Sequence, residues 1–156
     1  SGDLAKRTEN ITKLLDTHFD IPGIARFSAG PYWRAANETE RVTYTQSMRE
    51  AMIGTIARNF DQLVGLRFTI IDSQVKGNKM VLVRGTFGDK TGKRPPISVG
   101  WRVVTQTPAP SKVLDVEIEN ISMLVTQKQE NISIIRKNGG RFSALIEAMK
   151  QRQKSQ

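Results

Sequence analysis

Apolar residues recur at helical spacing through the first 64 residues. Asn37 followed by Glu40 has the spacing of a capping box, a reciprocal pair of side-chain to backbone hydrogen bonds that begins a helix. Asp20 can cap a shorter helix that carries Pro22 in its first turn, where proline is tolerated. We therefore expect helices over residues 3–64. Four apolar residues form a stripe on the longest of them: Met48, Met52, Ile56 and Phe60.

Between residues 66 and 119 the apolar period changes to two, which predicts β-strands. Turn residues at 75–78 and at 107–111 separate the alternating runs. We expect a twisted antiparallel sheet of about four strands, with one packed face and one solvated face. Nine residues should form the packed face: Phe68, Ile70, Val81, Val83, Val99, Trp101, Val103, Val116 and Ile118.

Two further helices are expected over residues 126–153, the first starting at Thr126 and the second following the break at Gly139-Gly140. The order helices, sheet, helices indicates a single α+β domain over residues 1–156. A sheet that curls into a cone beneath helices has an interior that is hard to fill, which favours an apolar cavity. Five residues should close that cavity from the helical side: Met52, Ile56, Leu124, Phe142 and Ile146.

The amino-acid composition limits which kinds of site and binding partner are plausible. The 156 residues include no cysteine, which excludes disulfide bonds and thiolate metal sites, and no apolar window approaches the ~20 residues that span a bilayer. The formal net charge is +9, and residues 61–156 hold 16 basic and 8 acidic side chains. A basic surface suits an anionic lipid headgroup, an acidic protein or a nucleic acid. We do not expect nucleic acid, because the aromatic residues of the sheet share its apolar face instead of standing among the cations.

Few residues offer catalytic or metal-binding chemistry. His18 is the only histidine, and neither a nucleophile motif nor a set of metal ligands accompanies it. Asp115 falls on the strand face opposite the apolar residues, which predicts a solvated carboxylate. Asp72 has the parity of Phe68 and should point inward, so it is the better general base if the domain is a cone-fold enzyme acting on an apolar small molecule. We favour a protein that is not an enzyme, with no catalytic residue, metal or cofactor.

Three collinear blocks carry a resemblance to a known family. They are Ala-Arg-Phe…Gly-x-Tyr-Trp-Arg at 25–34, Val-x-Asp-Val-x-Ile-Glu-x-Ile-Ser at 113–122 and Gly-Gly-x-Phe at 139–142. The chain resembles, over nearly its whole length, the MlaC or toluene-tolerance family of periplasmic phospholipid-binding proteins. Two departures are visible: a further N-terminal helix and an aromatic pair in the strand at 112–114, both usual in the family, are missing here.

The resemblance implies a cone of the nuclear-transport-factor type and a soluble carrier that holds a lipid's acyl chains in a deep apolar pocket. It also implies exchange of lipid between an outer-membrane lipoprotein complex and an inner-membrane ABC transporter, which maintains outer-membrane lipid asymmetry. A related branch accompanies hopanoid biosynthesis, so a hopanoid-type lipid is an alternative cargo. The opening Ser1-Gly2 is typical of a cloning remnant, and we expect that a periplasmic leader has been removed.

Overall fold

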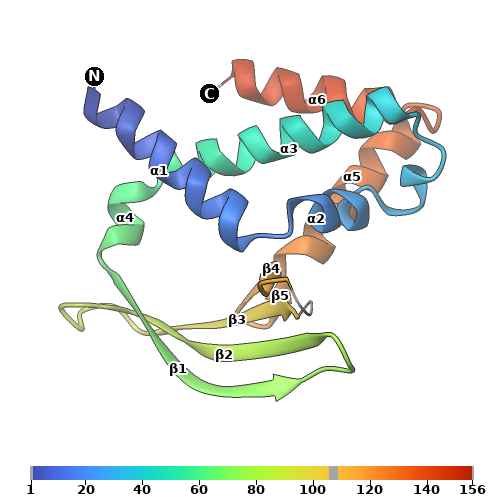
Figure 1. Cartoon of the computed structure of the whole chain (residues 1–156). Helices are drawn as coiled ribbons and strands as arrows, with labels where there is room; N and C mark the ends of the chain where they lie inside the picture. The colour runs from blue at the N-terminus through green and yellow to red at the C-terminus, as the bar shows by residue number, and fades with distance from the viewer. Residues whose placement is uncertain (1, 106–108, 156) are drawn as a thin grey trace.

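The computed structural model describes residues 2–105 and 109–155, arranged as a layer of helices above an antiparallel sheet (Figure 1). The predicted α+β class is confirmed. In chain order the elements are α1 (Gly2–His18), α2 (Ile21–Ser28), a 3₁₀ turn (Gly30–Trp33), α3 (Glu38–Arg58), α4 (Phe60–Val64), β1 (Leu66–Val75), β2 (Met80–Asp89), β3 (Ile97–Val104), β4 (Lys112–Ile118), β5 (Ile121–Ser122), α5 (Met123–Lys137) and α6 (Phe142–Lys154).

The helix starts follow the capping chemistry of the sequence at two of three sites. Asn37 and Glu40 form the predicted capping box of α3, and the side chain of Asp20 accepts from Gly23 N to start α2. The third prediction was wrong. Helix α5 begins at Met123 instead of Thr126, because the Ser122 side chain accepts from Val125 N and caps the helix three residues earlier. Gly139 and Gly140 both have positive φ and separate α5 from α6 as expected.

The sheet has five strands in the order β1-β2-β3-β4-β5, all antiparallel, one more than expected because the two-residue β5 pairs with β4. Cross-strand partners place all nine predicted apolar residues on one face: Val83 pairs with Trp101, and Trp101 with Val116. Phe68 lies beside Phe87 on that face, with ring centroids 5.1 Å apart. The predicted turn at 107–111 falls partly outside the described residues.

The inward placement of Asp72 was wrong. The register of β1 against β2 shifts between Ile70 and Asp72, so Ile71 is an extra residue that reverses the parity of the strand after it. Asp72 therefore stands opposite Arg84 on the face away from Phe68, and its carboxylate accepts two hydrogen bonds from the Arg84 guanidinium. That guanidinium lowers the pKa of Asp72. A carboxylate whose pKa is lowered by a paired guanidinium is a weak base, so Asp72 is a poor candidate for a general base.

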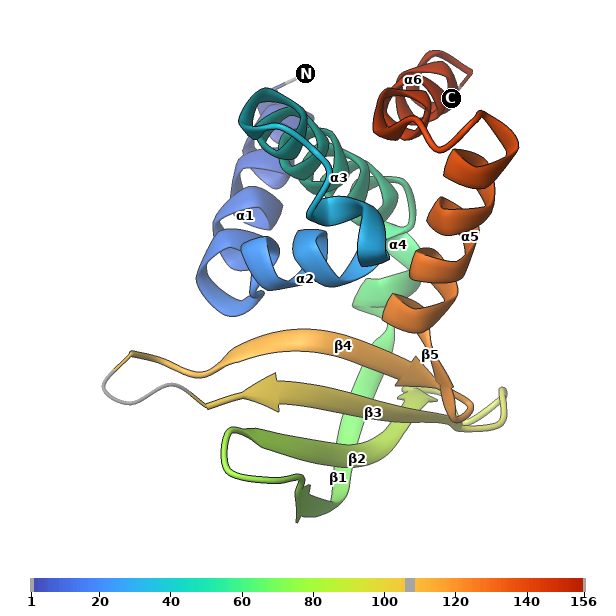
Figure 2. The same cartoon turned by 90° about the vertical axis from the view of Figure 1, so that its right-hand side faces the viewer.

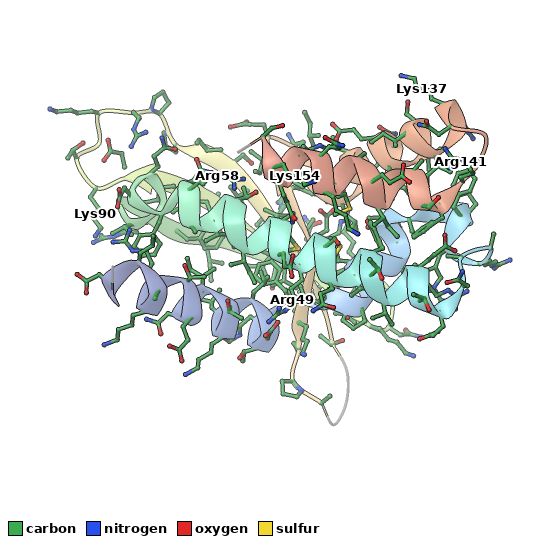
Figure 3. The ribbon with its side chains drawn as sticks, turned by 90° about the horizontal axis from the view of Figure 1, so that it is seen from above. Arg49, Arg58, Lys90, Lys137, Arg141 and Lys154 are labelled. Atoms are coloured by element: carbon green, nitrogen blue, oxygen red, sulfur yellow. The ribbon has the colours of Figure 1, made fainter. Side chains whose placement is uncertain are left out.

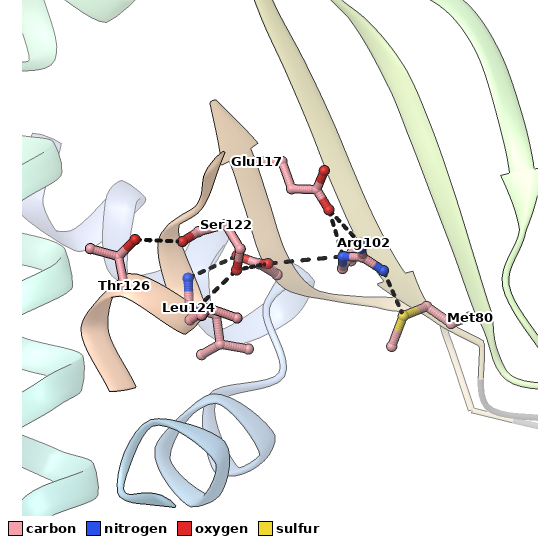
Figure 4. Close-up of polar contacts among 8 residues, drawn as sticks. Met80, Arg102, Glu117, Ser122, Leu124 and Thr126 are labelled. Carbon is pink, nitrogen blue, oxygen red and sulfur yellow. Dashed lines mark hydrogen bonds and ion pairs between the residues drawn. The ribbon is translucent and has the colours of Figure 1, made fainter. Parts of the chain in front are cut away.

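The prediction of a solvated Asp115 was also wrong, because the start of α5 covers it. The residue is 6% exposed, and its carboxylate accepts from Leu124 N at 2.9 Å and from the Ser122 hydroxyl (Figure 4). Arg102 lies at 4.0 Å and donates its closer hydrogen bond to Glu117. Asp115 thus joins the edge of the sheet to the N-terminus of α5, where a negative charge is stabilised by the helix dipole.

The hydrophobic core lies within the helical layer. Leu15, Ile135 and Leu145 are fully buried there, and the Tyr44 ring packs edge-on against Phe142. The helices touch the sheet chiefly along β4, through α1, α2 and α5. Figure 2 shows α5 and α6 on one side of the helical layer and α1, α2 and α3 on the other, above the β4 edge of the sheet. The sheet is therefore attached to the helices mainly by one strand.

Candidate functional site

A cavity of about 520 Å³ lies among α2, α3, α5, α6 and β4. Binding sites for small molecules and cofactors are typically about 300–1,000 Å³ and mostly apolar. The middle of this cavity fits that description, because thioether and branched aliphatic side chains line it. The main ones are Met48, Met52, Ile56, Val116, Leu124 and Met149.

The structure separates the fourteen predicted site residues into three groups. Met52, Ile56, Val116 and Leu124 line the cavity. Phe142 and Ile146 lie instead in the helical core, at 6% and 8% exposed. The other eight share the apolar face of the sheet with Val116 but do not line the cavity: Phe68, Ile70, Val81, Val83, Val99, Trp101, Val103 and Ile118. Contact of any of the fourteen with a ligand stays a prediction.

Outside the cavity the apolar sheet face is incompletely covered. Ile70 is 65% exposed, and Ile97 and Ile118 are each about 40% exposed. The rings of Phe68, Phe87 and Trp101 are half-buried, mostly against one another at centroid distances of 5.1–6.1 Å. Because Val116 belongs both to this face and to the cavity wall, the cavity and the incompletely covered face form one continuous apolar surface.

One wall of the cavity is polar and buried. Tyr44 on α3 and Ser28 on α2 share a hydrogen bond between their hydroxyls, and Asn131 on α5 donates its side-chain amide to the Tyr44 hydroxyl at 3.1 Å and to Ser28 O at 3.0 Å. Burial raises the pKa of the Tyr44 phenol, so it stays neutral. The polar side chains of this network hydrogen-bond to one another, which is typical of a structural contact that holds three helices together.

Sequence reasoning missed that network, although a signal for it exists. Asn131 lies seven residues after Leu124 and four before Ile135, so an amide interrupts an otherwise apolar helix face. A buried amide at such a position needs hydrogen-bond partners on neighbouring elements. The spacing on α5 alone could not have identified Tyr44 and Ser28 as those partners.

The opposite part of the lining is basic. Arg58 is the last residue of α3, and Arg152 and Gln153 lie in the last turn of α6. Figure 3 shows α3 and α6 side by side, with Arg58 and Lys154 toward the same end and Lys137 and Arg141 at the other. Pattern analysis had treated the α3 stripe only as apolar and had assigned no role to these arginines.

Two other kinds of site find no support within the described part of the chain. No group of three or more histidine, aspartate or glutamate side chains is placed to hold a metal ion. None of the helices between residues 2 and 155 has the length and apolar character needed to cross a bilayer.

Comparisons with known proteins agree with this geometry. The phospholipid-binding protein of Ralstonia solanacearum, solved in complex with a phospholipid, superposes with a TM-score of 0.81 at 20% sequence identity. The match covers 97% of this chain and 86% of that one, so the two share a fold. A search of curated proteins finds no match. The family model for the MlaC protein matches residues 1–151, and the chain therefore belongs to the MlaC family.

Proposed function

We propose that this protein binds the acyl chains of a phospholipid in the cavity between α3, α5, α6 and β4 and carries the lipid through water. The observation that carries the proposal is the continuity between a cavity lined by apolar side chains and an apolar sheet face that the helices leave incompletely covered. Soluble proteins rarely leave such a surface exposed unless something binds there.

The physical chemistry of lipid transfer supports this assignment. Removing a methylene group from water contributes about 0.8 kcal/mol, so two acyl chains supply ample binding energy without polar contacts. A carrier of this kind needs a large apolar space and no reactive group. Of the two carboxylates considered as general bases, Asp72 is paired with Arg84 outside the cavity lining. Asp115 does line the cavity, but its two oxygens already accept hydrogen bonds from the Ser122 hydroxyl and from Leu124 N at the start of α5.

Membership of the MlaC family supports a finer proposal. The protein would act in the periplasm, take its cargo at one membrane and deliver it at the other, with an inner-membrane ABC transporter complex and an outer-membrane lipoprotein complex as partners. This traffic would maintain the lipid asymmetry of the outer membrane. The solved phospholipid complex of the Ralstonia solanacearum protein favours a phospholipid over a hopanoid-type cargo.

Native mass spectrometry after incubation with phospholipid vesicles tests the binding proposal. The expected species is the protein with one bound phospholipid. Met52→Trp should lower its abundance, because the indole fills the middle of the cavity. Val42→Trp is the matched control: Val42 lies on the same helix, is 55% exposed and does not line the cavity, so occupancy should stay at the wild-type level.

A second variant asks how far the ligand extends along the sheet. Val83 is on the apolar face but outside the cavity lining. Val83→Trp should lower occupancy if acyl chains lie against that face. Wild-type protein that remains free of lipid at vesicle concentrations that saturate a lipid carrier would overturn the proposed function.

A further inference from the structure

The basic end of the cavity is formed by two arginines from different helices. Arg58 ends α3 and Arg152 lies in the last turn of α6, and both contribute to the lining. Since α3 and α6 pack together with these ends on the same side (Figure 3), the two guanidinium groups belong to one region of the molecule. Lys150 and Lys154 occupy the same last turns of α6 and add positive charge beside it.

In the described part of the chain, these arginines have no acidic partner, in contrast to the ion-paired Arg49 and Arg84. Arg49 donates two hydrogen bonds to Asp16, and Arg84 does the same to Asp72. Within residues 2–105 and 109–155, no carboxylate lies within salt-bridge distance of either Arg58 or Arg152. A guanidinium carries five N–H donors in a planar fork that matches phosphate oxygens. Both groups therefore retain donors for an anion.

The position of Arg58 is further set by a glycine one turn earlier on its helix. A Cβ atom at Gly54 would lie 3.1 Å from Arg58 Nη1, so the guanidinium folds back over the glycine. It also donates to the Thr55 hydroxyl at 3.3 Å, and Thr55 lines the cavity. Glycine inside a helix is less favourable than alanine. At Gly54 its small size leaves room for the arginine against the cavity wall.

We infer that Arg58 and Arg152 bind the headgroup phosphate of the cargo and give the protein a preference for phospholipids with net negative charge. The inference rests on the proposed function, because it takes the acyl chains to occupy the apolar middle of the cavity beside Met52 and Ile56. An anionic headgroup places a phosphate against the two guanidinium groups. A zwitterionic headgroup brings an ammonium group as well, which Lys150 and Lys154 repel.

A competition between two lipids tests the inference. The protein is incubated at low ionic strength with vesicles of phosphatidylglycerol and phosphatidylethanolamine in equal amounts and with identical acyl chains, and the bound lipids are quantified by mass spectrometry. Wild-type protein should be enriched about threefold in phosphatidylglycerol, the size expected of partly exposed charge contacts. The double variant Arg58→Gln/Arg152→Gln should return the ratio to that of the vesicles.

Arg136→Gln is the matched control. It removes one positive charge from an exposed site near the end of α5, away from the cavity lining, and should keep the threefold enrichment. Gly54→Ala should reduce the enrichment partly, because the new methyl group displaces the Arg58 guanidinium. A loss in Arg136→Gln at least half as large as that in the double variant, which removes twice the charge, would show a bulk charge effect and overturn the assignment.

Three further outcomes would overturn the inference. The first is a wild-type protein that shows no preference between the two lipids. The second is a double variant that keeps the wild-type ratio. The third is saturation of the two arginines by micromolar inorganic phosphate in lipid-free protein, which would assign the pair to free phosphate. Failure of the proposed function gives a different result, since the wild-type protein then takes up neither lipid.

Discussion

The helical layer and the sheet of this protein bury their apolar residues to very different degrees. In the helical layer Leu15, Ile135 and Leu145 are 0% exposed and pack against one another and their neighbours. On the apolar face of the sheet Ile70 is 65% exposed, and the aromatic rings are only half-buried. Both regions present large apolar side chains, and what differs is how far other elements cover them.

This difference in burial indicates that the helical layer mainly stabilises the fold, whereas the sheet face is available for binding. The helices supply a close-packed core, which is the usual source of stability. The sheet is joined to that core mainly along β4. On the rest of its apolar face Ile70, Ile97 and Ile118 stay at least 40% exposed without a ligand. A bound hydrocarbon chain would cover part of that surface, so ligand binding should stabilise the protein by mass action.

The largest expected effect contrasts one residue from each region. Leu145→Ala removes a fully buried side chain of the helical core and should lower the free energy of unfolding by about 2–5 kcal/mol. Ile70→Ala removes a similar number of carbon atoms from the exposed sheet face and should change it by about 0.5 kcal/mol or less. Urea unfolding of both variants measures the contrast. Equal losses would show that the sheet face is packed in solution.

The next largest expected change in stability comes from Asp115, which links the sheet to the helical layer. Asp115→Ala leaves Leu124 N without its acceptor at the start of α5 and should lower the free energy of unfolding by about 2–3 kcal/mol. Glu119→Ala is the control, because Glu119 is exposed in the turn after β4 and its carboxylate accepts only from Ser98 N at 3.2 Å. Urea unfolding again provides the measurement. A loss no larger than that of the control would mean that α5 does not depend on this contact.

The buried network of the helical layer predicts a dependence on pH. Tyr44→Phe removes the hydroxyl that joins Ser28 and Asn131 and should lower the free energy of unfolding by about 1–2 kcal/mol at pH 7. Because burial raises the Tyr44 pKa above 10.0, the folded state holds the phenolic proton more tightly than the unfolded state does. That stabilisation is fully present below pH 10 and is lost as the pH rises through the folded-state pKa.

Unfolding experiments from pH 7 to 11 test this sign. The wild-type protein should lose stability relative to Tyr44→Phe only above about pH 10. A wild-type advantage that grew with rising pH would contradict a neutral, buried phenol at this position.

The smallest effect lies on the solvated face of the sheet. Asp72→Asn removes the ion pair with Arg84, whose side chains are 39% and 49% exposed, and should change the free energy of unfolding by less than about 1 kcal/mol. Lipid occupancy in native mass spectrometry should not change, because Asp72 lies on the face away from Phe68 and outside the cavity lining. A marked loss of lipid would place Asp72 in the binding site after all.

Much of the fold could be predicted because its determinants are local. Alternation along each strand identified the nine residues of the apolar sheet face, and the Asn37–Glu40 pair fixed the start of α3. The errors arose where a distant element intervened. One extra residue at Ile71 reversed the parity of Asp72, and the docking of α5 buried Asp115. Neither the bulge in β1 nor the docking of α5 can be predicted from the alternation of apolar and polar residues along a strand.

The candidate site was predicted only in part for a similar reason. The α3 stripe correctly pointed to Met52 and Ile56 as residues of the inner helix face. A stripe does not reveal which helix it will face, however, so Phe142 and Ile146 were expected in the cavity and lie in the helical core. Arg58 was missed because it does not interrupt the apolar stripe of α3. Its place at the cavity depends on the packing of α3 beside α6.

The most direct test of the account is to locate the bound chain by photo-cross-linking. A phospholipid with a diazirine near the end of one acyl chain is bound and irradiated, and the modified peptides are sequenced. We predict adducts in residues 48–56 of α3 and in residues 114–124 of β4, β5 and α5, which together line the apolar middle of the cavity. Adducts confined to the outer surface of α1, at a level no higher than a water-soluble diazirine gives, would contradict the claim that this cavity holds hydrocarbon.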